Sequence, residues 1–131
     1  MSGNRVLLDT NVIILLSKSK IDAKKLSTRY NEFFVSMITY MEIYGFDFKE
    51  EKEKRRIDAF FANVELVNIS MEIAETVIRY KGEKMRKIKL PDAIILATAS
   101  LLGAELLSDD WSDFIGIDKS VMVKDISDLK Q

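Results

Sequence analysis

Carboxylates are the side chains best placed to carry chemistry in this chain, because it has neither histidine nor cysteine. Both residue types are absent from all 131 positions of the sequence. Their absence excludes an imidazole base or metal ligand, a serine-triad base, a cysteine nucleophile, zinc–thiolate sites and disulfides. Catalysis would therefore depend on carboxylates, hydroxyls, lysines, arginines or a bound metal ion.

Four acidic residues stand out by their surroundings in the sequence. Asp9 and Asp110 each follow a short apolar run of the kind that forms a buried strand. Asp92 is the only charge at the start of a long apolar segment, and Glu42 lies among apolar residues of an expected helix. Taken singly, Asp9 could merely cap a helix and Asp92 could merely complement a helix dipole. Likewise, Glu42 could be a surface residue and Asp110 a turn residue.

Considered together, these acids predict a metal site. In sheets of parallel strands, ligands bind beyond the carboxyl ends of the strands. Converging carboxylates repel one another and resist ionising together unless a cation lies between them. Mg²⁺ and Mn²⁺ prefer such oxygen ligands, and they polarise phosphates and activate water without any histidine. The pattern therefore favours metal-dependent chemistry on a phosphate ester.

The elements that must position these acids follow from the hydrophobic pattern. Short apolar runs predict buried strands at 6–8, 33–35, 64–67, 105–107 and 121–123. The segments between them predict helices at 11–17, 22–31, 36–45, 49–63, 70–85 and 91–103. Pro91 is expected to open the last of these helices, and Gly103 to close it. This alternation predicts an α/β fold with a parallel sheet covered by helices on both faces, in a single domain over residues 1–131.

No segment predicts a membrane span. The first apolar run stops at Asp9, so it is no signal peptide, and the longest nearly apolar stretch covers only residues 93–104. A membrane-spanning helix needs about 20 residues. We therefore expect a cytoplasmic protein that does not enter a membrane.

The four acids lie within four blocks of sequence that occur together in a known family. The blocks read VLLDTNVII at 6–14, SMITYMEI at 36–43, LPDAIILATA at 90–99 and LLSDDWSDF at 106–114. In this order and spacing the chain resembles the PIN-domain ribonucleases, and among them the VapC-like toxins of toxin–antitoxin pairs. Any one block is unspecific, but the four together span nearly the whole chain.

The resemblance implies a three-layer α/β/α domain whose five parallel strands have the order 3-2-1-4-5. It also implies a metal site formed by Asp9, Glu42, Asp92 and Asp110. Residues expected to support this site by hydrogen bonds are Asn11 and Ser108, with Thr10 and Thr39 as weaker candidates. The family places its fourth acid two residues after a Ser or Thr, which indicates Asp110 and leaves Asp109 as a near rival. Asp113 is expected to be structural.

The function implied by the resemblance is hydrolysis of single-stranded RNA with Mg²⁺ or Mn²⁺, leaving a 5′-phosphate. VapC-like members are typically homodimers, held inactive by an antitoxin protein that inserts into the active-site groove. The net charge of −1 provides no overall attraction for RNA, so a local basic cluster is needed. The best candidates precede Asp92 in the sequence: Lys84, Arg86, Lys87 and Lys89. A solvated helix end is the simpler interpretation of this run.

Other functions remain open at this point. A catalytically inactive PIN-like module that binds RNA or protein is the main alternative, although the presence of all four acids counts against it. Receiver domains need an acid on a later central strand, but the run at 64–67 ends in Val67-Asn68. Haloacid-dehalogenase-like phosphatases need Asp-x-Asp, whereas Asp9 is followed by Thr10 and Asn11. A structure-specific DNA nuclease would need an extra helical arch, for which the chain is too short.

Overall fold

A five-stranded parallel sheet forms the centre of the protein. The structure is a computed structural model that describes residues 4–83 and 87–131. The strands are β1 (Arg5–Leu8), β2 (Glu32–Ser36), β3 (Glu65–Val67), β4 (Glu105–Ser108) and β5 (Val123–Asp125). Their spatial order is β3-β2-β1-β4-β5, and every neighbouring pair is parallel. The predicted fold class and strand order are confirmed.

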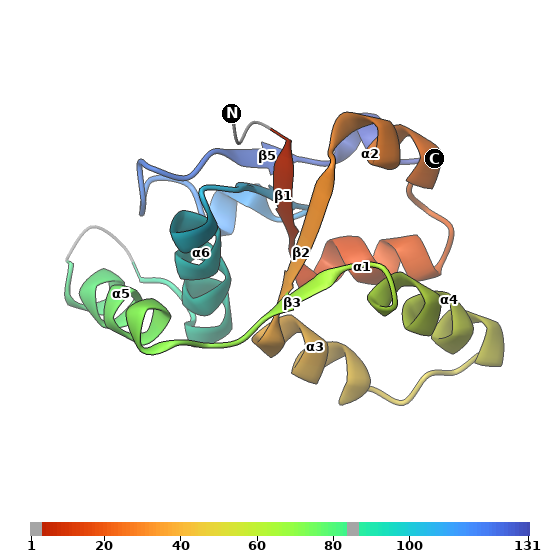
Figure 1. The fold of residues 1–131 in the computed structure, drawn as a ribbon, viewed down its shortest axis with the longest axis horizontal. Coiled ribbons are helices and arrows are strands. Elements are labelled where there is room, and N and C mark those ends of the chain that lie inside the picture. The colour runs from red at the N-terminus through yellow and green to blue at the C-terminus, as the bar shows by residue number, and fades with distance from the viewer. Residues whose placement is uncertain (1–3, 84–86) are drawn as a thin grey trace.

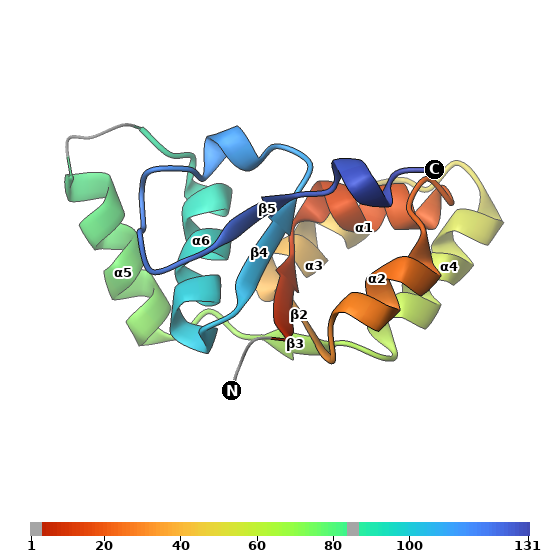
Figure 2. The same cartoon turned by 90° about the horizontal axis from the view of Figure 1, so that it is seen from above.

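Helices connect the strands. They are α1 (Thr10–Ser17), α2 (Ala23–Arg29), α3 (Met37–Tyr44), α4 (Glu51–Phe61), α5 (Met71–Gly82) and α6 (Leu90–Leu102), with short 3₁₀ turns η1 (Trp111–Asp113) and η2 (Ser127–Leu129). Figures 1 and 2 show α5 and α6 on one side of the sheet and α1, α2 and α4 on the other. The helix α3 begins at the end of β2, at the same edge of the sheet where α1 begins (Figure 1). This arrangement is the three-layer α/β/α sandwich that the sequence predicted.

Alternating side chains of the strands hold the layers together. In β1, Leu7 packs in the cluster with α5 and α6, whereas Val6 and Leu8 pack in the cluster with α1, α2 and α4. All three are fully buried. This two-residue alternation is the geometry of a strand buried on both faces, and it explains why the run is continuously apolar. The two resulting cores hold the carboxyl ends of β1 and β4 in fixed register, with Leu8 paired to Leu107.

Local capping signals set the helix boundaries next to this edge. Asp9 accepts a hydrogen bond from the Thr10 amide and caps α1. Ser36 caps α3 by accepting from the Ile38 amide. On the opposite face of the sheet, α6 has a proline in its first turn and ends before Gly103. The φ of Gly103 is 62°, a left-handed conformation that glycine tolerates best. The predicted start and end of this helix are therefore confirmed.

The fifth strand begins later than the sequence predicted. The apolar run suggested residues 121–123, but β5 is Val123–Asp125 and pairs with β4 from Val123 opposite Leu106. Val121 is buried in the core just after a turn, in which its amide bonds to the Asp118 carbonyl. The apolar run that contains Val121 suggested a strand, but Val121 is apolar because it packs in the core and not because it pairs in the sheet. The register against β4 decides where pairing starts, and it is not visible in a local sequence pattern.

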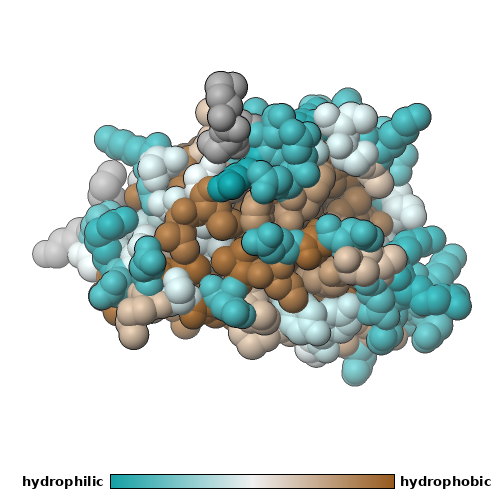
Figure 3. Space-filling view, in the orientation of Figure 1, coloured by the Kyte–Doolittle hydropathy of each residue, from teal (hydrophilic) through white to brown (hydrophobic). Residues whose placement is uncertain are grey.

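Aromatic side chains pack between α3 and α4. Tyr44 contacts Phe48 and Phe61, and Tyr40 also contacts Phe61. Phe46 is different, because 62% of its side chain is exposed. Apolar side chains reach the surface between the two helical groups (Figure 3). Across the described residues, no helix is long and apolar enough to cross a membrane.

Candidate active site

The four predicted acids line one pocket at the carboxyl edge of the sheet. Asp9 follows β1 and Asp110 follows the neighbouring strand β4, so both side chains start from the same edge. Glu42 reaches the pocket from α3, and Asp92 from the first turn of α6. The cavity has a volume of about 280 Å³ and is lined by Asp9, Thr10, Asn11, Ile14, Glu42, Phe46, Asp92, Asp110 and Asp113. Segments far apart in the sequence thus contribute carboxylates to one small volume.

Asp9 is held rigidly at the bottom of this site. Its side chain is only 6% exposed, and one carboxylate oxygen accepts from the Thr10 amide at 2.8 Å. The other oxygen accepts from the buried Ser108 hydroxyl at 2.7 Å. That hydroxyl in turn accepts from the Asp110 amide at 2.9 Å. Ser108 therefore links the two strand-end acids, and it orients Asp9 while it fixes the backbone that carries Asp110.

Polar side chains also orient two of the other acids. The Thr10 hydroxyl donates to Glu42 Oε1 at 2.8 Å and contacts the buried Thr39 hydroxyl at 3.0 Å. The Asn11 amide donates to Asp110 Oδ2 at 2.9 Å. The Thr10 hydrogen bond joins α1 to α3, and the Asn11 hydrogen bond joins α1 to the residue that carries the strand-end acid after β4. The structure thus brings every residue predicted to support the site into contact with it, except Asp109.

Asp109 and Asp110 point to different neighbours although they are adjacent. Asp109 forms an ion pair with Lys130 at 2.9 Å and does not line the pocket. Asp110 lines the pocket and accepts from Asn11. Of the two acids that the sequence left open, Asp110 is therefore the one that lies in the pocket.

Asp113 lines the acidic pocket, a position that the sequence did not lead us to expect. It was expected to be structural, yet it lines the acidic pocket from η1. Its charge is also the largest electrostatic contribution that raises the pKa of Asp92. The available signal was its spacing of three residues from Asp110, because one 3₁₀ turn returns a side chain to the same side.

Burial and the charges of neighbouring acids make Asp9 and Asp92 hard to ionise. Burial raises the pKa of Asp9 from 3.8 to about 6, and the charges of Asp92 and Asp110 add to the rise. The hydrogen bonds from Ser108 and Thr10 act in the opposite direction and lower this pKa. The pKa of Asp92 is also raised, first by burial and then by the charges of Asp113 and Glu42. A bound cation would reverse this penalty, because it favours the ionised form of every acid around it.

The donor set fits a hard divalent cation by its chemistry. The acids that line the pocket offer carboxylate oxygens, the ligands preferred by Mg²⁺ and Mn²⁺, and the chain has no histidine or cysteine to favour zinc or copper. Within residues 4–83 and 87–131, no three acids are already grouped tightly enough to enclose an ion. The expected ligand set is thus gathered in one pocket without a completed coordination shell.

The predicted basic cluster is only partly described. Lys84 and Arg86 lie outside the described residues. Lys87 and Lys89 are exposed and do not line the acidic pocket. Lys89 is nevertheless close enough to lower the pKa of Asp92. Its position directly before α6 puts one positive charge beside the acidic pocket.

Comparison with known proteins identifies the family. A family model described as PIN domain matches residues 6–120. The chain belongs to the PIN domain family. This confirms the resemblance drawn from the four sequence blocks. None of the curated proteins compared with this PIN domain matches it.

Solved structures share its fold. A toxin–antitoxin complex from Klebsiella pneumoniae contains a chain that is 35% identical to this PIN domain, with a TM-score of 0.72 over 89% of this chain and 95% of that one. VapBC2 from Rickettsia felis, bound to a promoter DNA fragment, matches with a TM-score of 0.77 at 20% identity, over 92% of this chain and 98% of that one. DNA-bound VapBC from Salmonella typhimurium matches with a TM-score of 0.74 at 23% identity, over 92% of this chain and 97% of that one. The VapBC matches, at these low identities, show the shared fold.

Proposed function

We propose that this PIN domain is a metal-dependent endoribonuclease, a VapC-like toxin that hydrolyses phosphodiester bonds of single-stranded RNA. The observation that carries the proposal is the buried Asp9, fixed by Ser108 in a pocket with four further carboxylates. A folded protein keeps such a costly arrangement of like charges where it serves a cation. The family and its toxin–antitoxin structural neighbours support RNA as the substrate class.

In this proposal Asp9, Glu42, Asp92 and Asp110 would hold Mg²⁺ or Mn²⁺. Asp9 and Asp92 would hold the principal ion, and Glu42 and Asp110 would hold a second ion or bind the first through water. A bound ion would lower the pKa of a coordinated water toward neutrality and stabilise the charge that develops on the phosphate and the leaving oxygen.

The surrounding residues position these acids. Ser108 donates to Asp9 and accepts from the amide of Asp110, so it keeps the two acids at a fixed separation. Thr10 holds Glu42 against the end of α1, and Asn11 holds Asp110 by its side chain. Because these contacts exist before substrate arrives, little reorganisation is needed when RNA binds. Removal of such an outer partner typically costs about 10- to 100-fold in metal affinity or activity.

The same proposal includes a protein partner. We infer that an antitoxin protein binds this PIN domain and blocks the acidic pocket, because structural neighbours are toxin–antitoxin complexes. We also propose a homodimer. Exposed apolar side chains such as Met71 and Ile78, which are 75% and 70% exposed, are available for such contacts.

Cleavage of a mixed single-stranded RNA tests the proposal, with adjacent acids as a matched pair. Purified protein is assayed with Mn²⁺, with Mg²⁺ and with chelator, beside Asp110→Asn and Asp109→Asn. We expect metal-dependent cleavage that falls in Asp110→Asn by more than the roughly 100-fold typical of an outer-shell loss. Asp109→Asn should stay close to the wild type, because its carboxylate pairs with Lys130 outside the pocket. Metal-independent cleavage, or equal losses in both variants, would contradict the proposed site, and RNA binding without cleavage would indicate the non-cutting module.

A further inference from the structure

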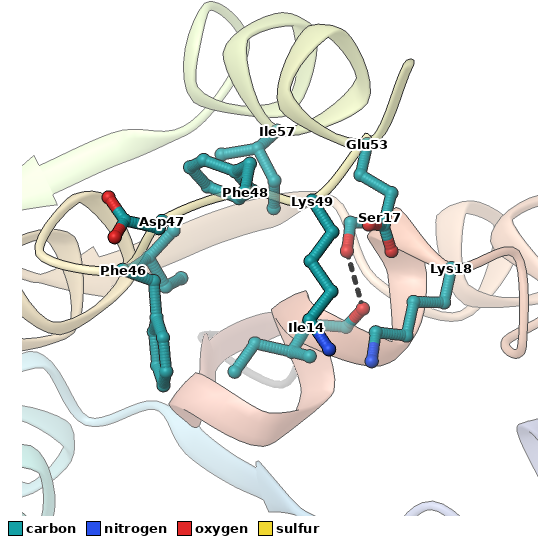
Figure 4. Close-up of a pocket in the computed structure, with 10 residues that line it drawn as sticks. Ile14, Ser17, Lys18, Phe46, Asp47, Phe48, Lys49, Glu53 and Ile57 are labelled. Atoms are coloured by element: carbon teal, nitrogen blue, oxygen red, sulfur yellow. Dashed lines mark hydrogen bonds between the residues drawn. The ribbon is translucent and has the colours of Figure 1, made fainter. Parts of the chain in front are cut away.

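A second cavity opens beside the acidic pocket. It lies between α1, the loop after α3 and the start of α4, and Figure 4 shows the residues that line it. Its volume is about 250 Å³, below the roughly 300 Å³ at which pockets for drug-sized ligands begin. The cavity is lined by Ile14, Ser17, Lys18, Ile43, Phe46, Asp47, Phe48, Lys49, Glu53 and Ile57. The space suits one planar ring or one side chain, and it is too small for a folded partner segment.

The two cavities share a wall. Ile14 and Phe46 line both the acidic pocket and this second cavity. Phe46 is 62% exposed, so its ring is not part of the core. An exposed aromatic ring on the wall between two cavities offers a face on which an unpaired base can stack. A strand whose phosphate lies at the acids could therefore place its next base in this cavity.

Two positive charges lie at the far side of the cavity. Figure 4 shows Lys18 and Lys49 extending toward the same part of the cavity, next to Ile14. Neither lysine forms an ion pair within the described residues, although other surface lysines such as Lys54 and Lys130 do. Two ammonium groups directed at one place are suited to bind backbone phosphates.

Two acids also line the cavity, but neither neutralises these lysines by contact. Figure 4 shows the Asp47 carboxylate turned away from both ammonium groups. Glu53 is half-buried and forms no ion pair among the described residues. The cavity therefore combines an apolar interior with a cationic rim. Among the described residues, the four charged side chains of this cavity sum to zero formal charge, whereas the acidic pocket next to it is lined by five acids and no basic residue.

We propose that this cavity binds the base adjacent to the scissile phosphate of single-stranded RNA, with Phe46 stacking on the base and Lys18 and Lys49 binding the phosphate beyond it. The proposal rests on the proposed nuclease function and names how its substrate is positioned. The shared wall, the size of the cavity and the cationic rim favour an RNA strand over a protein segment. Phe46 and the two lysines act as positioning residues and do not touch the reacting atoms.

Binding of short RNA in chelator tests this proposal without any cleavage. Fluorescein-labelled single-stranded oligonucleotides are titrated with wild type, Phe46→Ala and the double variant Lys18→Ala/Lys49→Ala, and anisotropy gives Kd. We expect Phe46→Ala to bind roughly 10-fold more weakly, as is typical when a stacking side chain is removed. The double variant should reduce the magnitude of the slope of log K against log salt by about 0.7, because both lysines contact one phosphate and each phosphate contact on a single strand contributes about 0.7. Leu101→Ala and Lys24→Ala, exposed residues that do not line the cavity, serve as matched controls.

An abasic nucleotide moved along the oligonucleotide gives a sharper test. For the wild type, one position should weaken binding by roughly 10-fold. In Phe46→Ala the same abasic nucleotide should cause no further loss, because the stacking partner is already absent. Unchanged RNA affinity in both variants would overturn the inference. Weaker RNA binding by the variants of a wild type that never cleaves RNA would support the cavity as a base-binding site, but it would refute the proposed nuclease and with it the assignment of the neighbouring phosphate as scissile.

Discussion

Neutralising Asp9 should stabilise the metal-free protein at neutral pH. Burial raises the pKa of this carboxyl from 3.8 to about 6. Each pH unit of such a difference corresponds to about 1.4 kcal/mol, so ionised Asp9 costs the folded state about 3 kcal/mol. Between these two pH values the folded chain binds the proton more tightly than the unfolded chain does. The stabilisation from this group is therefore complete below pH 3.8 and is lost as the pH rises through about 6.

Asp9→Asn removes this titration while it keeps the size of the side chain. We expect the unfolding free energy of Asp9→Asn, minus that of the wild type, to increase by about 2 to 3 kcal/mol between pH 4 and pH 8 in chelator. The assay is urea unfolding followed by circular dichroism at each pH. Taking the difference at each pH cancels the contributions of the other titrating groups. The pH-dependent part of the difference then reports the charge of Asp9, whereas a changed hydrogen bond to Ser108 adds only a constant.

The neighbouring acid is the control. Asp109→Asn loses an ion pair with the exposed Lys130, and exposed ion pairs contribute little to stability, so the variant should be equally stable or slightly less stable. A difference between Asp9→Asn and wild type that stays constant from pH 4 to pH 8 would refute the reasoning. A wild type that gains stability relative to the variant as the pH rises would also refute it, because burial would then not be the dominant influence on this carboxyl.

Three further outcomes are expected. Asp92→Asn should leave the thermal stability of the metal-free protein unchanged or raise it. In a thermal melt with Mn²⁺ the variant should lose most of the metal-induced stabilisation, which is about 2.7 kcal/mol when the ion is present at 100 times its Kd. A metal-induced stabilisation equal to that of the wild type would exclude Asp92 as a ligand. Ser108→Ala should cost about 1 to 3 kcal/mol in urea unfolding and lower RNA cleavage by about 10- to 100-fold, since two contacts of one buried hydroxyl are lost. Asp113→Asn should lower the pKa of Asp92, because it removes a neighbouring negative charge. The pH dependence of thermal stability in chelator measures this effect, and a pH dependence equal to that of the wild type would mean that the two charges do not interact.

Much of the fold was predictable because it depends on local pattern. Continuous apolar runs such as Val6–Leu8 indicate strands buried on both faces, and Pro91 and Gly103 bound a helix by their backbone preferences alone. The start of β5 was wrong by two residues, because Val121 is buried without being paired. Organisation as one domain, the homodimer and the roles of the site residues stay predictions.

What the sequence by itself determined is the kind of chemistry and the elements that carry it. The absence of histidine and cysteine excludes imidazole and thiol chemistry, and Asp9 and Asp110 were recognisable because each follows a buried strand. Only the tertiary structure separates the two adjacent acids by position, because Asp109 forms an ion pair with Lys130, far away in the chain, whereas Asp110 lines the pocket. It also brought Asp113 into the pocket and placed Phe46 between two cavities. The physical reason is that periodicity predicts which face of an element is buried, whereas the direction of a loop side chain depends on packing between distant segments.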